Sequence, residues 1–129
     1  DALGVALANA QRLGLDIGFH RGDWWSALPG MSFHLVLSNP PYIRPGDPHL
    51  PALRHEPQLA LTSEANGLAA LQAIVAGAAD HLEAGGWLLL EHGHDQAAAV
   101  QGLLREHGYI DVQTRPDLAG VPRCTGGHR

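Results

Sequence analysis

The sequence contains no lysine, so all eight basic side chains among its 129 residues are arginines. Lysine is the residue that forms Schiff bases, and a Walker-type phosphate loop also requires it. A lysine can serve as a general base as well. The absence of lysine excludes these three kinds of chemistry for this stretch of chain.

Cysteine is nearly absent too, since Cys124 is the single one. One cysteine excludes an internal disulfide and any zinc site built from several cysteines. Apolar runs are short, such as Trp87–Leu90, whereas a membrane span needs about 20 residues. No basic region followed by a hydrophobic stretch opens the chain, as a secretion signal would. We therefore expect a cytoplasmic enzyme or binding domain without a membrane partner.

The charge balance is acidic, with 13 acidic against 8 basic side chains and a formal net charge of −5. This balance argues against a nucleic-acid-binding surface, which would need a basic face. Hydrophobic residues make up 45% and charged residues 16% of the chain, a composition that excludes disorder and is typical of a globular protein. At this length we expect a single domain over residues 1–129.

Hydrophobic periodicity predicts helices alternating with strands, and a long proline-rich loop interrupts the pattern. Such alternation indicates an α/β fold with a mostly parallel sheet, whose ligands bind beyond the carboxyl ends of the strands. The predicted helices are residues 3–13, 65–82 and 96–107; the predicted strands are 17–21, 33–38, 87–91, 109–114 and one beginning at 123; the loop is 43–63.

Three short segments follow predicted strands, and each contains side chains suited to a ligand-binding or catalytic site. They are Gly22-Asp23-Trp24, Asn39-Pro40-Pro41-Tyr42 and Glu91-His92-Gly93. Because parallel strands end at the same edge of a sheet, we expect these segments to converge there.

The segment Asn39-Pro40-Pro41-Tyr42 can present two fixed hydrogen-bond acceptors. They are the side-chain carbonyl of Asn39 and the backbone carbonyl of Pro40. Two such acceptors can take both hydrogens of a planar –NH2 group, orient its lone pair and polarise its nitrogen toward an electrophile. Tyr42 offers a face for the planar group. The alternative interpretation is a turn that ends the strand, with Asn39 as its cap.

Ser38-Asn39-Pro40-Pro41-Tyr42-Ile43 is identified as the amino-methyltransferase motif of S-adenosylmethionine-dependent enzymes. The chain as a whole resembles the release factor glutamine methyltransferases. Further matching segments run in order over nearly the whole chain: Gly22-Asp23-Trp24, Asp47-Pro48-His49-Leu50, Glu56-Pro57, Ala60-Leu61, Gly67-Leu68, Leu90-Glu91-His92-Gly93, Gln96, Asp117-Leu118-Ala119-Gly120 and Arg123.

The resemblance implies a Rossmann-like sheet that binds S-adenosylmethionine. It also implies methylation of the side-chain amide nitrogen, N5, of the glutamine in the Gly-Gly-Gln loop of peptide chain release factors. Asn39 through Tyr42 would hold that amide, with Asn39, Pro40 and Tyr42 as the catalytic residues. Asp23, Trp24 and Asn39 would bind the cofactor, Trp24 beside its adenosine. No metal is implied.

One departure from the family is large. The family's strand order is 3-2-1-4-5-7-6, and its glycine-rich loop and ribose-binding acid would precede Asp1, which matches the start of the next helix. The resemblance therefore predicts an N-terminally truncated sheet without its first two strands. We expect a partial catalytic domain that binds the cofactor weakly or not at all by itself.

Other interpretations stay open. Arg54-His55 is similar to the related ribosomal-protein glutamine methyltransferases, and the four-residue motif also occurs in nucleic-acid amino-methyltransferases. A catalytically incompetent fragment is a third possibility. His92 and His94 could ligate a metal, but no third ligand is evident. Glu91 is either a general base or a carboxylate that caps a neighbouring turn.

Overall fold

The computed structural model describes residues 2–129, so the assignment made for Asp1 lies outside the described residues. The chain divides into two units, one ending at Gly30 and the other covering Met31–Arg129. The first unit contains α1 (Ala2–Leu13), which confirms the predicted helix, and a short 3-10 helix, η1 (Trp24–Ala27). Gly14 follows α1 with a φ of 65°, as a helix C-cap glycine does.

The predicted strand over residues 17–21 is wrong, because residues 15–21 form no regular element. A strand exists only through hydrogen bonds to a neighbour. An apolar-polar pattern alone supplies no such neighbour.

The second unit is built on a four-stranded sheet with the order β1-β2-β4-β3. β1 pairs parallel with β2, whereas β4 is antiparallel to both β2 and β3. Three strands therefore run in one direction and β4 alone is reversed, so the predicted mostly parallel sheet is correct for strand direction. This order matches 4-5-7-6 of the expected family order. The strands are β1 (Phe33–Ser38), β2 (Leu82–Glu91), β3 (Ile110–Pro116) and β4 (Pro122–His128).

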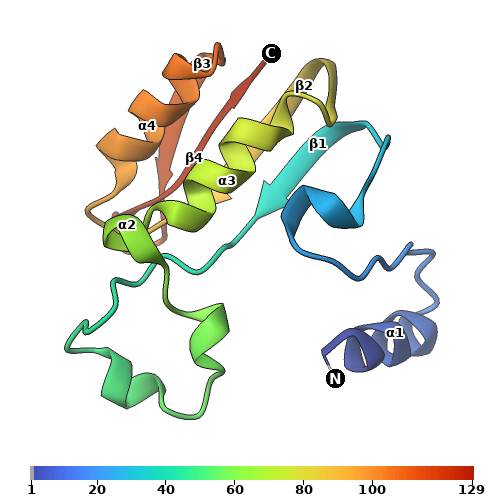
Figure 1. Cartoon of the computed structure of the whole chain (residues 1–129), viewed down its shortest axis with the longest axis horizontal. Helices are drawn as coiled ribbons and strands as arrows, with labels where there is room; N and C mark the ends of the chain where they lie inside the picture. The colour runs from blue at the N-terminus through green and yellow to red at the C-terminus, as the bar shows by residue number, and fades with distance from the viewer. Residues whose placement is uncertain (1) are drawn as a thin grey trace. The chain divides into compact units, whose positions relative to one another are not determined.

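Two helices, α3 (Ala69–Ala78) and α4 (Ala97–Glu106), pack on the sheet and on each other (Figure 1). Their apolar faces and the residues of β2 that face them form the core of this unit. The side chains of the core with no exposed surface include Leu71, Val75, Leu88, Leu90, Val100 and Leu104.

The opposite face of β1 is open. Leu35 and Leu37 expose 50% and 67% of their surface. The mostly apolar composition of β1 is typical of a strand buried on both faces, and that interpretation is wrong for this chain, because no second layer covers Leu35 and Leu37.

The predicted helix over residues 65–82 is divided in the structure. A short α2 (Glu64–Gly67) precedes α3, and Ala65, Asn66 and Gly67 have positive φ values of 51°, 57° and 84°. At the other end β2 begins at Leu82, the last residue of the predicted helix, and includes Gly85-Gly86. Pairing explains the difference, because Leu82 is aligned with Phe33 and Gly85 N–H donates to the Arg129 carbonyl.

No helix among residues 2–129 is long and apolar enough to cross a membrane.

Candidate functional site

Two of the three predicted segments meet at the carboxyl ends of β1 and β2. β1 stops at Ser38 because the prolines that follow have no N–H to donate to a ladder. The chain then turns so that the hydroxyl of Tyr42 donates to the carboxylate of Glu91, with 3.0 Å between Oη and Oε1. The two segments are thus joined side chain to side chain.

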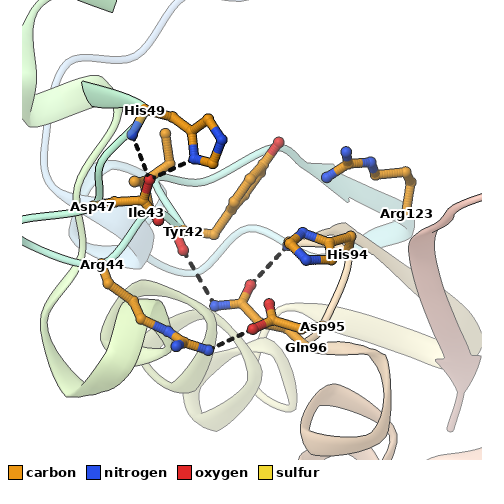
Figure 2. A pocket seen from close by; sticks show the side chains of 10 residues that line it. Tyr42, Ile43, Arg44, Asp47, His49, His94, Asp95, Gln96 and Arg123 are labelled. Carbon is orange, nitrogen blue, oxygen red and sulfur yellow. Dashed lines mark hydrogen bonds and ion pairs between the residues drawn. The ribbon is translucent and has the colours of Figure 1, made fainter. Parts of the chain in front are cut away.

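Gln96 holds the backbone of both segments. Its carboxamide nitrogen donates to the carbonyls of Tyr42 and Asn66, at 3.2 and 3.3 Å, and its oxygen accepts from Gly93 N–H at 2.7 Å (Figure 2). Only 4% of the residue is exposed. The sequence placed Gln96 in a matching segment but gave it no role. Its partner Tyr42 is 54 positions away, and no local pattern reports such a contact.

Gly67 allows a third segment, the turn at α2, to approach the backbone of Tyr42 closely. Its φ of 84° favours glycine, and an added Cβ would overlap the Tyr42 carbonyl. The turn at α2 can therefore pack against the motif only with glycine at this position.

The loop over residues 43–63 closes back on the motif. Ile43 N–H donates to the Leu61 carbonyl and Ser63 N–H to the Ile43 carbonyl, both at 2.9 Å. Between loop and motif lies a cavity of about 240 Å³, hereafter the motif cavity, lined by Asn39, Pro40, Pro41, Tyr42, Ile43, Leu53, Glu56, Ala60 and Leu61. Within residues 2–129, neither the Asn39 carboxamide nor the Pro40 carbonyl makes a hydrogen bond, so both acceptors are free.

A larger cavity of about 570 Å³ adjoins the motif cavity along Tyr42 and Ile43. We call it the arginine cavity (Figure 2). Its lining residues are Tyr42, Ile43, Arg44, Asp47, His49, Gly93, His94, Asp95, Gln96 and Arg123. Arg44 is paired with Asp95, 2.5 Å apart, and His49 with Asp47, 2.9 Å apart.

A third cavity, of about 290 Å³, is also lined by Asn39. Its other lining residues are Leu37, Ser38, Leu89, Glu91 and Cys124. It contains a carboxylate and no cationic side chain, so it is suited to a cationic or neutral group.

Burial, and after it Glu91, determine the electrostatics of the site. Burial raises the pKa of the Tyr42 phenol, and the hydrogen bond to Glu91 and the charge of that carboxylate raise it further, while Arg123 acts in the opposite sense. Burial, and then the charge of Glu91, also raise the pKa of the Cys124 thiol. Glu91 thus accepts from Tyr42 rather than capping a neighbouring turn.

His92 takes part in a buried chain of hydrogen bonds. Its Nδ1 lies 2.9 Å from the Gly93 carbonyl and its Nε2 lies 2.7 Å from Thr125 Oγ1, which is in turn 2.7 Å from Thr114 Oγ1. Since a carbonyl only accepts, Nδ1 carries a hydrogen. Both ring nitrogens of His92 are thus engaged. Among residues 2–129 no group of three or more histidine, cysteine or acidic side chains is arranged to hold a metal.

The third predicted segment, Gly22-Asp23-Trp24, lies in the first unit. Asp23 N–H donates to Ser26 Oγ at 3.1 Å, and that hydroxyl donates to the Asp23 carbonyl. Trp24 has a φ of 46° and 40% of its surface is exposed. The carboxylate of Asp23 and the indole of Trp24 are therefore open to a ligand.

The comparisons with known proteins agree with the motifs. The release factor glutamine methyltransferase of Burkholderia pseudomallei is 52% identical over 135 residues, and that of Bordetella pertussis is 50% identical over 130. The enzyme of the same name from Neisseria gonorrhoeae is 47% identical over 130 residues. Each alignment covers 98% of this chain and 47–48% of the relative, so the chain spans about half the length of the curated relatives it matches. The resemblance predicted from the motifs is confirmed.

A solved structure shows the fold. The crystal structure of a methyltransferase from Pyrococcus furiosus superposes with a TM-score of 0.70 at 18% identity, covering 98% of this chain and 56% of that one. The α/β, Rossmann-like fold predicted from the sequence is thereby confirmed. No protein-family model matches the chain.

Proposed function

We propose that residues 1–129 are part of the catalytic domain of an S-adenosylmethionine-dependent methyltransferase that modifies N5 of a glutamine in peptide chain release factors. The acceptor is the glutamine of their Gly-Gly-Gln loop. The observation that carries the proposal is the pair of free acceptors, the Asn39 carboxamide and the Pro40 carbonyl, lining one cavity beside Tyr42. The names of the curated relatives support the choice of reaction and substrate.

The acceptors address the main difficulty of the reaction. The nitrogen of an amide is a poor nucleophile because its lone pair is delocalised into the carbonyl. Asn39 and Pro40 accept its two hydrogens, which fixes the plane of the amide, favours charge on nitrogen and directs the lone pair away from both acceptors. The ring of Tyr42 provides a wall for the amide plane, and Glu91 fixes that ring through its hydroxyl.

No general base is needed before the transfer. The nitrogen becomes cationic when it gains the methyl group, and it then loses one of the hydrogens that face Asn39 and Pro40. The site therefore needs acceptors rather than a strong base, and the absence of lysine is no obstacle.

Each unit, taken separately, contains residues that suit one part of the cofactor. Asn39 and Glu91 line the third cavity, where a carboxylate without a neighbouring cation suits a sulfonium ion. Asp23 and the exposed indole of Trp24 suit an adenine, the carboxylate as acceptor for its amine and the ring as a stacking face. When bound, S-adenosylmethionine supplies the electrophilic methyl group.

The experiment is a methyl-transfer assay with the protein expressed from its complete gene and radiolabelled S-adenosylmethionine. A release factor should be labelled, and its variant with the loop glutamine changed to glutamate should not. Ribosomal protein and RNA serve as competing acceptors; labelling of either in place of the release factor would reject the proposed substrate.

The same assay tests the acceptor pair. Asn39→Ala should reduce kcat by about 10²–10³-fold, the usual effect of removing one fixed group that stabilises a transition state. The control is Asn9→Ala, which removes the same side chain from α1 and should leave transfer near normal. Near-normal transfer by Asn39→Ala would show that the motif cavity does not bind the amide.

A further inference from the structure

The substrate of such an enzyme is a peptide, and a peptide needs more room than one side chain. The motif cavity, at about 240 Å³, is smaller than the roughly 300–1,000 Å³ of sites that bind drug-sized ligands. The arginine cavity, at about 570 Å³, falls within that range. Because the two adjoin along Tyr42 and Ile43, a glutamine side chain in the first places its main chain beside the second.

Arg123 is the arginine of this cavity with guanidinium N–H groups to spare. Arg44 is engaged with Asp95 at 2.5 Å. Arg123 forms a longer ion pair with Asp117, with 3.6 Å between Nε and Oδ2, and 37% of its side chain is exposed. This pair engages Nε and leaves the two terminal nitrogens of the guanidinium for a ligand. The end of its side chain points toward the hydroxyl of Tyr42 (Figure 2).

The position of Arg123 is built by the turn between β3 and β4. Asp117 Oδ1 accepts from Ala119 N–H and from Val121 N–H, both at 2.9 Å. The carbonyl of Arg123 accepts from His92 N–H at 3.0 Å, which fixes its backbone beside the Glu91-His92-Gly93 segment. The guanidinium is therefore aimed by a rigid turn and a paired strand, and pre-organised donors of this kind lose little entropy on binding.

The charge of the cavity selects the kind of acceptor. Its lining contains two arginines, Arg44 and Arg123, and two aspartates, Asp47 and Asp95. Since these charges balance, the cavity has no net preference for a carboxylate. A neutral carbonyl oxygen is the acceptor that suits it.

We propose that Arg123 binds a main-chain carbonyl oxygen of the substrate peptide next to the acceptor glutamine. Arg123 is then a substrate-binding residue that selects a glutamine within a peptide over an isolated amide. This inference rests on the proposed glutamine methylation.

The test compares wild-type protein with Arg123→Gln, again expressed from the complete gene, on a peptide that contains the Gly-Gly-Gln sequence. A hydrogen bond from a charged group implies a rise in KM of about 10- to 100-fold, with kcat nearly unchanged. Arg105→Gln removes the same charge from the last turn of α4 and should leave both constants unchanged. Equal thermal melting temperatures would show that the variants are folded.

A second series of substrates identifies the main-chain carbonyl oxygen that Arg123 binds. Replacing the amide on either side of the glutamine by an ester weakens the carbonyl as an acceptor. One of the two esters should raise KM for the wild-type protein and have no further effect on Arg123→Gln, which is the coupling expected of direct partners. Unchanged KM in Arg123→Gln, or additive effects of both esters, would overturn the inference. A wild-type protein that methylates no peptide would instead reject the proposed function.

Discussion

The hydroxyl of Tyr42 donates a hydrogen bond to the carboxylate of Glu91 across 3.0 Å, although 49 positions separate the two residues. The bond joins the end of β1 to the end of β2, where ligands of an α/β sheet bind. It also fixes the side chain of Tyr42, a residue that lines both the motif cavity and the arginine cavity. The geometry of the proposed acceptor site thus depends on a contact between the motif that follows β1 and the last residue of β2.

Tyr42→Phe removes the hydroxyl and keeps the ring. We expect the free energy of unfolding to fall by about 1 kcal/mol, because Glu91 loses a partner in a part-buried setting. The measurement is the midpoint of urea denaturation. Tyr109→Phe is the matched control, because the Tyr109 hydroxyl is buried without a partner among the described residues. Its removal should be neutral or stabilising. Equal losses in both variants would show that the bond to Glu91 does not contribute.

Alkaline pH should weaken the same contact. Burial, the hydrogen bond to Glu91 and its charge raise the pKa of Tyr42 above the ordinary value of 10.0. The folded chain therefore favours the neutral phenol, whose contribution to stability is complete below about pH 10 and is lost as the pH rises through the folded pKa. Denaturation midpoints measured upward from about pH 9 should fall less steeply in Tyr42→Phe than in the wild type.

The Tyr42→Phe variant should still lose some stability as the pH rises. Burial raises the pKa of Tyr109 as well, and Tyr109 is untouched by the substitution. A pH profile identical to the wild type would therefore mean that Tyr42 does not titrate differently in the folded chain.

Gln96→Leu tests the link between the two segments. The substitution keeps approximate side-chain volume but leaves Gly93 N–H and the Tyr42 carbonyl without their partner. We expect a loss of about 1–3 kcal/mol in the free energy of unfolding, together with weaker methyl transfer. Gln72→Leu on the exposed side of α3 is the control and should change stability little. A stable and fully active Gln96→Leu would show that the motif keeps its position without Gln96.

The sequence predicts the parts of this molecule that are specified locally. The helix at 3–13, the strand at 33–38 and its end at Asn39 depend on periodicity, on a C-cap glycine and on prolines that cannot donate. The strand expected at 17–21 is the counterexample, because strand formation needs a partner that a local pattern does not contain.

The candidate site likewise has one part that the sequence predicts and another that it does not. The acceptor pair of Asn39 and Pro40 follows from residue chemistry at the end of a strand. The contacts that fix the site join distant positions, such as Gln96 to Tyr42 and Arg44 to Asp95. No spacing in the sequence predicts these contacts. The arginine cavity, and the place of Arg123 in its lining, are therefore known only from the structure.

Gly67→Ala should disturb the site through the backbone. Gly67 has a φ of 84°, and a Cβ there would overlap the carbonyl of Tyr42 and crowd the carboxamide of Gln96. Backbone atoms cannot yield as a flexible side chain does, so we expect a loss of about 1–3 kcal/mol in the free energy of unfolding, and reduced methyl transfer because Tyr42 is displaced.

Gly102→Ala is the matched control, since Gly102 lies inside α4 with open space around its missing Cβ. Alanine favours a helix interior over glycine, so that variant should gain about 0.5–1 kcal/mol. Urea denaturation of both variants measures the contrast. A Gly67→Ala protein as stable as Gly102→Ala would mean that the turn at α2 does not pack against the motif.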